Sequence, residues 1–385
     1  MKKIIFLFVF ILAASIFLSF VNPFTRSIIL GKRINCLVMG VDSISSGRHS
    51  DVILILSYNP KKRFLDVISV PRDTRISLPG LSIRKINQIY AYKYRQSKND
   101  KDAAIFLRDE MANMFGMEIP YYFQLDFDGF KRIINAIGGV RVRVEQVPDL
   151  VSSNTFISSG EVVLDGELAL SYVRERIGDR ADLDRILKQQ EFLCEMFHKA
   201  GTHHILFGLP EIFSLLRNCV NTNLGLWDIL TSLYEFKDFR ISDIRLQSLP
   251  GRPRGYYWLL DAAGVQKAFT LVLEGEVPDT GQIYTYSDVV VEIFNASDIS
   301  GAAGHMRKVF VEKGFDVVKI GAYGAGSHYR KTVVIDRLGQ PEKARSVADT
   351  IGTKIVLTKL DETRGVDVSV IIGEDLKELR QIWSK

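Results

Sequence analysis

The alternation of apolar and polar positions predicts a mixed α/β chain. Short apolar runs at residues 34–41, 52–57 and 64–70 predict strands, and Asn-Pro-Lys-Lys at 59–62 predicts a turn between the last two. Residues 102–115 repeat apolar side chains at helical spacing. Because strands and helices mix along the chain, we expect a central mixed sheet with helices on its faces.

The same pattern continues to residue 272. Further strands are predicted at 121–125, 140–144 and near 244–249. Further helices are predicted at 84–94, 127–137, 168–177, 181–199, 206–220 and 226–239. Residues 251–255 are predicted as a loop. The aromatic residues Tyr256, Tyr257 and Trp258 could lie in the core or face the membrane, and we favour the core.

A second, smaller α/β domain is predicted after a stretch rich in Gly, Pro, Asp and Thr. Its strands are expected near 289–295, 315–320, 332–336, 354–357 and 366–372, with helices at 301–313 and 341–351. The predicted organisation is an N-terminal membrane anchor at 1–33, a larger α/β domain at 34–272, a linker at 273–288 and a C-terminal domain at 289–385.

The N-terminal run at residues 4–21 is apolar apart from two serines. Roughly 18 helical residues span about 27 Å, close to the thickness of a bilayer core. No small-x-small cleavage site follows, so we favour an uncleaved anchor over a signal peptide. Lys2 and Lys3 predict a cytoplasmic N-terminus and a cell-membrane protein whose bulk is extracytoplasmic, although Arg26, Lys32 and Arg33 weaken the charge asymmetry.

Composition excludes several functional classes. The net charge of +5 is spread along the chain without a basic block, and no DNA-binding motif is recognisable, so we expect no nucleic-acid partner. Three widely separated cysteines indicate neither a disulfide framework nor a zinc site. The sequence also lacks the motifs of P-loop ATPases, HExxH zinc proteases and GxSxG hydrolases.

Charged residues at predicted strand ends are the first candidates for chemistry. Val-Pro-Arg-Asp-Thr-Arg at 70–75 places Arg72, Asp73 and Arg75 where a strand ends, and ligand sites of α/β sheets lie there. A surface turn with local ion pairs is an equally good interpretation. Asp42 and Asp51 bracket one loop and could share Mg²⁺, although both could instead form turns and caps.

A basic region follows in the predicted helices between residues 168 and 199. It contains Arg174, Arg176, Arg180, Arg185 and Lys188, and Arg185 lies one helical turn from Gln189. Arginine forks suit phosphate oxygens, so these donors could clamp a diphosphate. Ordinary solvent-exposed charges on a helix face are the alternative.

Together these residues resemble the LytR-CpsA-Psr family of bacterial envelope glycopolymer transferases, from about residue 34 to 192. The matching pieces are Leu-Val-Met-Gly-Val-Asp-Ser at 37–43, Ser-Asp at 50–51, Ser-Val-Pro-Arg-Asp-Thr at 69–74, Lys-Ile-Asn at 85–87, Phe-Asp-Gly-Phe at 127–130, Ile-Gly-Gly-Val at 137–140, Leu-Asp-Gly at 164–166, Ala-Leu-Ser-Tyr-Val-Arg-Glu-Arg at 169–176 and Asp-Leu-Asp-Arg at 182–185, followed by Gln189. Residues 289 to about 375 are similar to the LytR C-terminal domain.

The resemblance implies an enzyme that moves a glycan phosphate from a polyprenyl-pyrophosphate carrier to a cell-wall hydroxyl, with peptidoglycan as the expected acceptor. It implies catalytic roles for Arg72 and Asp73 and Mg²⁺ ligation by Asp42 and Asp51. The pyrophosphate-binding set that it implies is Arg72, Lys85, Arg174, Arg176, Arg185 and Gln189. A polyprenyl-pyrophosphate hydrolase and a non-enzymatic envelope-binding or regulatory protein are the alternatives.

Two positions depart from the family pattern. Arg48 is separated from Ser50-Asp51 by His49, whereas the family usually has the arginine directly before Ser-Asp. Lys188 stands before Gln189 where arginine is usual, so the charge is kept but the bidentate fork is lost. Both departures leave the identity of the acceptor open.

Overall fold

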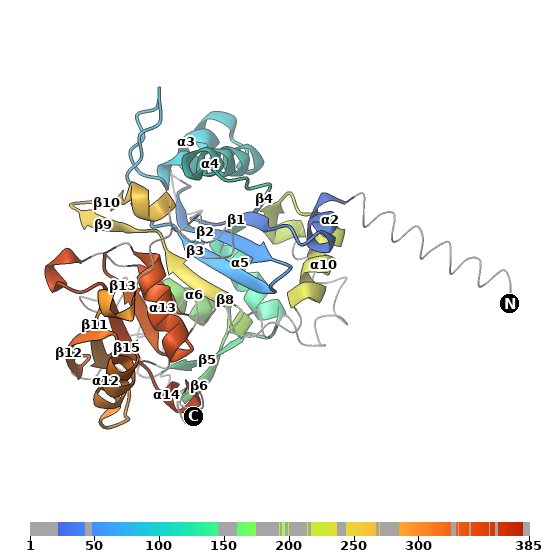
Figure 1. The fold of residues 1–385 in the computed structure, drawn as a ribbon. Helices are drawn as coiled ribbons and strands as arrows, with labels where there is room; N and C mark the ends of the chain where they lie inside the picture. The colour runs from blue at the N-terminus through green and yellow to red at the C-terminus, as the bar shows by residue number, and fades with distance from the viewer. Residues whose placement is uncertain are drawn as a thin grey trace, which may run out of the picture.

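The computed structural model describes residues 22–42, 48–144, 160–174, 217–236, 244–266, 285–324, 331–338, 340–353, 355–358 and 361–379, with single residues at 192, 195, 196, 199, 214, 269 and 329. These residues form an α/β unit with a central mixed sheet and a separate C-terminal α/β domain, as the sequence predicts (Figure 1).

The central sheet has six strands in the order β7-β4-β1-β2-β3-β8. Its strands are β1 (Ile34–Val41), β2 (Ser50–Asn59), β3 (Phe64–Ser69), β4 (Tyr121–Asp126), β7 (Val220–Thr222) and β8 (Ile244–Ser248). β2 runs antiparallel to β1 and β3, whereas β4 is parallel to β1 and β8 is parallel to β3. The ends of β1, β3, β4 and β8 therefore share one sheet edge with the start of β2.

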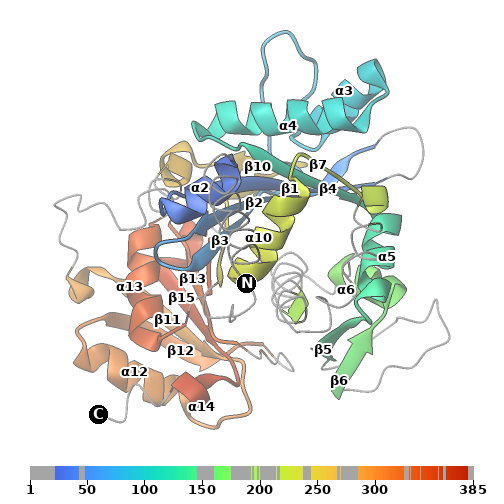
Figure 2. The same cartoon turned by 90° about the vertical axis from the view of Figure 1, so that its right-hand side faces the viewer.

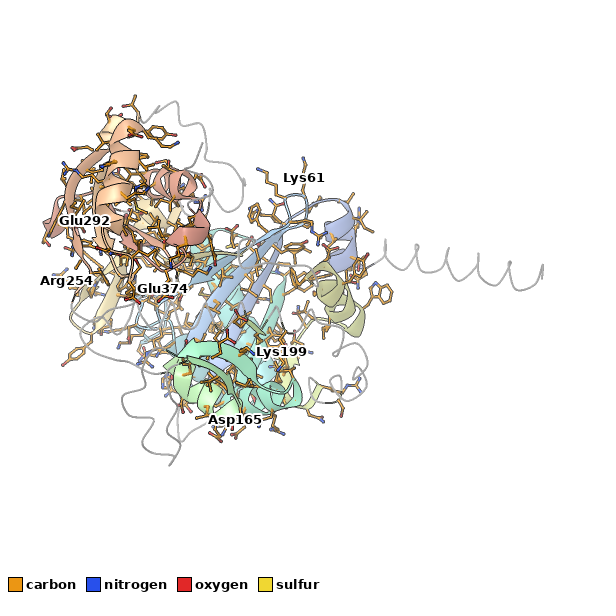
Figure 3. The ribbon with its side chains drawn as sticks, turned by 90° about the horizontal axis from the view of Figure 1, so that it is seen from below. Lys61, Asp165, Lys199, Arg254, Glu292 and Glu374 are labelled. Carbon is orange, nitrogen blue, oxygen red and sulfur yellow. The ribbon has the colours of Figure 1, made fainter. Side chains whose placement is uncertain are left out.

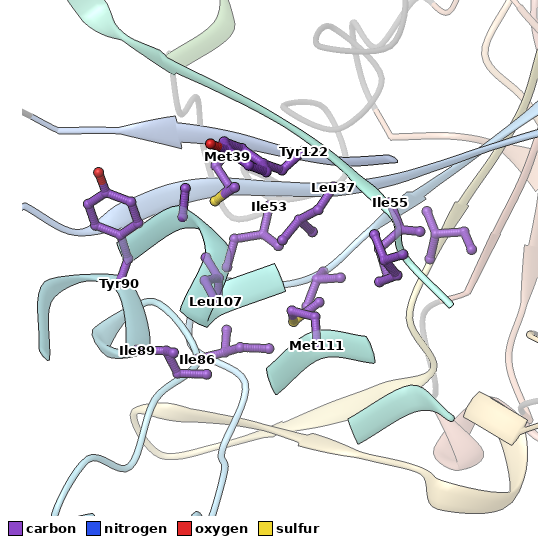
Figure 4. Packing of buried hydrophobic residues seen from close by; sticks show 14 of the residues in the cluster. Leu37, Met39, Ile53, Ile55, Ile86, Ile89, Tyr90, Leu107, Met111 and Tyr122 are labelled. Carbon is purple, nitrogen blue, oxygen red and sulfur yellow. The ribbon is translucent and has the colours of Figure 1, made fainter. Parts of the chain in front are cut away.

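One face of this sheet is covered by α3 (Gln88–Ser97) and α4 (Asp100–Phe115) (Figure 2). Alternate residues of β1 and β2 point towards these helices, and Leu37 and Ile55 are fully buried there. Leu107 and Met111 lie one helical turn apart on α4 and pack into the same core (Figure 4). Asn99 caps α4 at its start and Gly116 ends it with a φ of 61°.

The opposite face carries α5 (Phe127–Ala136), α6 (Gly166–Arg174) and α10 (Leu226–Phe236) (Figure 2). α5 and α6 pack with the hairpin of β5 (Val140–Val144) and β6 (Gly160–Leu164) around a second apolar core. Gly138 and Gly139, with φ of 75° and 77°, turn the chain from α5 into β5. These glycines occupy backbone conformations that other residues rarely adopt.

The N-terminal described segment is a short helix, α2 (Pro23–Ile29), within the range predicted as the anchor. Its Phe24 is buried against Tyr121 with ring centroids 5.2 Å apart, and the Asn22 amide donates to Asp228 Oδ1 at 2.7 Å. Among the described residues no helix has both the length and the apolar character to span a membrane. The predicted anchor run at 4–21 lies outside the described residues.

The C-terminal domain is a five-stranded sheet in the order β12-β11-β15-β13-β14. Its elements are β11 (Val290–Asn295), α12 (Ala302–Glu312), β12 (Asp316–Ala322), β13 (Val333–Asp336), α13 (Pro341–Ile351), β14 (Val356–Thr358), β15 (Val368–Ile372) and α14 (Leu376–Leu379). α12 and α13 pack on the sheet through buried Phe310 and Val347. β14 lies beside β8, so edge strands of the two sheets are neighbours.

Four local predictions differ from the structure. Val220–Thr222, where no strand is predicted, pairs with β4 directly after helical residues 217–219, because tertiary pairing outweighs local propensity in so short a segment. The predicted loop after Pro250 is a hairpin of β9 (Gly251–Arg254) and β10 (Tyr257–Leu260), turned by Gly255. Helix α3 begins at Gln88 and not at residue 84, because Lys85 pairs with Arg75 and residues 86 and 87 form a turn. Tyr256 is 87% exposed and therefore lies outside the core.

Candidate active site

The ends of β1 and β3 and the start of β2 bring the first candidate residues to one sheet edge. Asp42 follows β1, Asp51 lies at the start of β2, and Arg72 and Asp73 follow β3. β1 and β2 pair with a register shift at Gly40 and Val41, directly before Asp42. These segments therefore converge at one end of the sheet.

Arg72 and Asp73 form the centre of a chain of ion pairs. Arg72 Nη1 donates to Asp51 Oδ1 at 3.0 Å, and Arg72 Nε lies 3.8 Å from Asp73 Oδ2. Lys85 Nζ donates to Asp73 Oδ1 at 2.7 Å. The four side chains are 25–41% exposed, so a ligand can reach their charged groups from solvent. Two cations and two carboxylates thus lie within contact of one another, although they are up to 34 residues apart in sequence.

The backbone around Arg72 and Asp73 is held on both sides. Thr74 is fully buried, and its carbonyl accepts from the Ile86 N–H at 2.9 Å. On the other side the Asp73 carbonyl accepts from the Trp258 N–H at 2.9 Å. These bonds fix the direction of the side chains, because a loop with paired backbone groups has few alternative conformations.

Lys85 reaches the site from the extended segment before α3. Arg75 and Lys85 face each other in an antiparallel bridge, and the Asn87 N–H donates to the Arg72 carbonyl at 3.3 Å. The Asn87 carbonyl in turn accepts from the Ser50 N–H at 3.4 Å. This hydrogen-bonded path joins the segments that carry Lys85, Arg72 and Asp51.

Asp42 lies at the other side of the β1–β2 connection, where its N–H donates to the His49 carbonyl at 2.9 Å. Its position at the end of β1, next to the start of β2, agrees with the prediction that the two aspartates bracket one loop. Within the described part of the chain, no group of three or more His, Cys, Asp or Glu side chains is placed to hold a metal ion.

Arg48, which departs from the family pattern, contacts the start of α4. Its guanidinium donates to both carboxylate oxygens of Asp100 and lies 4.5 Å from the Tyr94 ring centroid. The Tyr90 hydroxyl also donates to Asp100, at 2.5 Å. Burial and this carboxylate raise the pKa of Tyr90. Arg48 therefore anchors the loop before Ser50 to the helical layer.

The second predicted group of cations is only partly placed. Arg174 is the last residue of α6, which follows the Leu-Asp-Gly turn on the α5 side of the sheet. The side chain of Arg174 lies outside the described residues, as do Arg176, Arg185 and Gln189. Their predicted role in pyrophosphate binding stays a prediction.

Tyr257 is the residue beside the site that sequence reasoning missed. Its ring lies 5.6 Å from Lys85 Nζ and 5.7 Å from the Arg75 guanidinium, close enough for cation–π contacts. The only sequence signal is an aromatic cluster after an arginine-rich loop, which equally fits a core segment. Cys36 is half-buried, and burial raises the pKa of its thiol to about 12.

Comparison with known sequences gives two matched regions. The profile of the LytR-CpsA-Psr family matches residues 26–272, and that of the LytR cell envelope-related transcriptional attenuator matches residues 288–376. A polyisoprenyl-teichoic acid–peptidoglycan teichoic acid transferase, TagU of Oceanobacillus iheyensis, is 30% identical over 210 residues, which are 54% of this chain and 64% of the relative. TagV of Bacillus subtilis, with the same descriptive name, is 29% identical over 270 residues, 65% of this chain and 66% of the relative.

These two matches span slightly less than two thirds of the relatives' own lengths. Among solved structures, the crystal structure of B. subtilis TagV has a TM-score of 0.52 at 26% identity and covers 63% of this chain and 98% of its own. Protein gbs0355 of Streptococcus agalactiae has a TM-score of 0.52 at 21% identity, covering 65% and 90%, which shows a shared fold alone. With a family profile over most of its length and the Arg72–Asp51 and Lys85–Asp73 pairs at the expected motifs, this chain belongs to the LytR-CpsA-Psr family.

Proposed function

We propose that this protein transfers a glycan phosphate from a polyprenyl-pyrophosphate carrier to a hydroxyl of the cell wall, with peptidoglycan as the acceptor. The observation that carries the proposal is the linked set of Arg72, Asp51, Asp73 and Lys85 at one sheet edge. The descriptive names of TagU and TagV, which state transfer of teichoic acid to peptidoglycan, support the same reaction class.

In this reaction the acceptor oxygen forms a bond to the glycan-linked phosphorus while the bond from that phosphorus to the bridging oxygen breaks. Polyprenyl phosphate leaves and the hydroxyl proton passes to water. Charge on the phosphate oxygens must be neutralised and the reacting atoms aligned, which is where such enzymes gain most of their rate. Arg72 and Lys85 supply positive charge, and Asp73 orients both cations. Arg174, Arg176, Arg185 and Gln189 would complete the pyrophosphate-binding set.

Mg²⁺ is part of the proposal, with Asp42 and Asp51 as its protein ligands. The donor chemistry fits, because Mg²⁺ prefers hard oxygen ligands and needs few protein carboxylates when phosphate oxygens and water fill the other positions. Asp51 Oδ1 accepts a hydrogen bond from Arg72, and the Asp51 side chain is 25% exposed, so a ligand can approach its carboxylate. When bound, the ion would offset negative charge on the pyrophosphate.

A membrane position follows from the same substrate class. The polyprenyl carrier is a membrane lipid, and the apolar run at residues 4–21 is long enough for one span. We propose a single-pass protein of the cell membrane with a cytoplasmic N-terminus and an extracytoplasmic catalytic domain. α2 would then follow the membrane segment directly and connect it to the catalytic sheet through Phe24.

The test uses the full chain in lipid nanodiscs with Mg²⁺, a polyprenyl-pyrophosphate glycan and peptidoglycan fragments. Mass spectrometry should detect the glycan phosphate on the peptidoglycan and free polyprenyl phosphate in equal amounts. Loss of charge neutralisation in Arg72→Ala should reduce turnover by a factor on the order of 100 or more. Arg95→Ala removes an exposed arginine of α3 and should leave turnover unchanged.

Three outcomes separate the alternatives. Release of polyprenyl phosphate without modification of peptidoglycan would show a hydrolase instead of a transferase. Turnover that is equal with and without Mg²⁺ after chelator treatment would exclude the proposed ion. If the parent chain leaves every such lipid intact and Arg72→Ala is indistinguishable from it, the proposal of an enzyme fails. A binding or regulatory role then remains.

A further inference from the structure

Four extended segments lie side by side next to Arg72. Arg75 bridges Lys85 on one side, with the Ile76 N–H donating to the Arg84 carbonyl at 3.0 Å. On its other side Thr74 bridges Trp258, and the Arg75 N–H donates to the Trp258 carbonyl at 2.9 Å. β10 then pairs with β9, so a small sheet continues from Lys85 to the tip of the hairpin.

Bridged residues of neighbouring strands point to the same face of a sheet, and alternate residues point to opposite faces. Thr74, Ile76 and Ile86 point inwards and are buried. Arg75 and Lys85 therefore share the outer face with Tyr257, as their contacts with the Tyr257 ring confirm.

The register of the hairpin adds two more cations to this outer face. Tyr257 pairs with Arg254 and Leu259 pairs with Arg252, so both arginines lie on the side of Tyr257. Figure 3 shows Arg254 at the outer edge of the molecule. We call Arg75, Lys85, Arg252, Arg254 and Tyr257 the cationic face.

The cationic face carries more positive than negative charge. Arg75, Arg252 and Arg254 are exposed, and within the described ranges none of them forms an ion pair with a carboxylate. Lys85, the remaining cation of this face, is paired with Asp73, whose Oδ1 accepts from its Nζ at 2.7 Å. Three arginines on a rigid surface next to the site leave a positive field that attracts an anion.

The hairpin is built as a fixed element. Gly251 faces Trp258 so closely that an added Cβ would lie 2.3 Å from Trp258 Nε1, and the Trp258 N–H is bonded to Asp73. The arginines of β9 are therefore held at a constant distance from the catalytic segment. Arg252 and Arg254 alternate along β9, which puts their Cα atoms about 7 Å apart, and adjacent strands add about 5 Å each. The cations are therefore too far apart for one phosphate group to contact all of them. Several phosphate groups along one chain would match this spacing.

We propose that the cationic face binds the polymer part of the donor, as a chain of repeating phosphodiester units just beyond the pyrophosphate. This inference rests on the proposed function and extends its site from Lys85 to Arg252. A neutral glycan would leave the three arginines without counter-charges, whereas a polyphosphate chain supplies acceptors at intervals along the face. The Tyr257 ring would lie beneath the first repeat.

The experiment measures binding of two probes to the full chain by isothermal titration calorimetry. One probe is delipidated poly(glycerol phosphate), and the other is geranylgeranyl pyrophosphate, which has no polymer. Arg252→Gln/Arg254→Gln should weaken poly(glycerol phosphate) binding by about tenfold, because two exposed charge contacts are lost. Its affinity for the short pyrophosphate should change less than about twofold, since neither arginine lies among the ion pairs around Arg72.

The matched control is Arg307→Gln/Lys308→Gln, which removes two adjacent exposed cations from α12. It should bind both probes like the parent, and added salt should weaken polymer binding in the parent more than in the hairpin variant. Circular dichroism confirms that each variant is folded, and Arg252→Lys/Arg254→Lys should recover most of the lost affinity.

Two results would overturn this inference and leave the proposed function standing. In the first, the hairpin variant binds geranylgeranyl pyrophosphate and keeps the parent's affinity for poly(glycerol phosphate). In the second, the parent binds neutral dextran as tightly as poly(glycerol phosphate). Failure of the parent to bind either phosphate probe would overturn the proposed function together with this extension.

Discussion

At the scale of single residues, Asp73 is the side chain on which the site's geometry depends. It lies between Arg72 Nε at 3.8 Å and Lys85 Nζ at 2.7 Å, and its carbonyl accepts from Trp258. A carboxylate in this position holds two cations close together that would otherwise repel each other. Its contribution should therefore be to orientation more than to stability, because exposed ion pairs stabilise a fold weakly.

Asp73→Asn tests this role. The amide keeps the size of the side chain but loses the charge, so Arg72 and Lys85 should separate and turnover should fall by roughly 10- to 100-fold. The melting temperature should stay within about 2 °C of the parent value. Asp109→Asn, which removes an exposed carboxylate paired with Arg108, is the control. A large drop in melting temperature with unchanged kcat would assign Asp73 a structural role.

Asp375 supplies a pH-dependent contribution to stability. Burial raises the pKa of this carboxyl above its ordinary 3.8, although Thr332 donates to Oδ1 from N–H and Oγ1 and Lys331 Nζ lies 3.9 Å from Oδ2. The folded chain thus holds this proton more tightly than the unfolded chain does. The free energy of unfolding decreases as the pH rises through the interval between the unfolded and folded pKa values, and the loss persists at neutral pH.

Asp375→Asn should remove that loss, since an amide oxygen can accept from Thr332 without ionising. Urea unfolding should show the variant more stable than the parent at pH 7, with the difference shrinking towards pH 3.8. Glu374→Gln, next in sequence, serves as the control. A constant difference at every pH would mean that the ionisation of Asp375 contributes nothing.

At the scale of elements, α5 and α6 touch through a glycine. Gly166 starts α6, its N–H donates to Asn135 Oδ1 at 2.8 Å, and an added Cβ would lie 2.4 Å from the Lys131 carbonyl oxygen. The close approach explains why the Leu-Asp-Gly motif ends in glycine. It also fixes the direction of α6, whose last residue is Arg174.

Gly166→Ala should lower the free energy of unfolding by about 1–3 kcal/mol, because backbone of α5 has to move away. Gly304→Ala is the opposite case, since this helical glycine of α12 has open space around its Cβ position. That change should raise stability by roughly 0.5–1 kcal/mol. Differential scanning calorimetry of both variants checks the pair, and equal effects of the two alanines would contradict the geometry at Gly166.

At the scale of the whole molecule, the sequence predicts the elements that have a clear hydrophobic periodicity. It misses the short strands that form only because they pair with a neighbouring strand. β1 and α13 lie at their predicted bounds, since an apolar run and a Pro-started helix carry local signals. β7 has three residues and β9 contains Arg-Pro-Arg, so neither has an alternating pattern to detect. Strand pairing created both.

The candidate site divides in the same way. Motif residues such as Arg72 and Asp73 could be named from the sequence together with the family resemblance. The sequence could not predict which carboxylate pairs with each cation, because the Arg72–Asp51 pair depends on the register of β2 against β3. Tyr257 lies 172 residues after Lys85 and meets it only in the folded chain.

The neighbouring edges of the two sheets give a prediction about the whole chain. β8 ends the six-stranded sheet and β14 lies beside it, so the C-terminal domain shields an edge that could otherwise pair with another molecule. A chain that ends at residue 284 should therefore self-associate at concentrations where the full chain is monomeric, as measured by size-exclusion chromatography with light scattering. Val318→Lys in the full chain places a charge on the exposed edge strand β12 and should leave the mass unchanged. A shortened chain that stays monomeric with an unchanged melting temperature would show that β8 needs no cover.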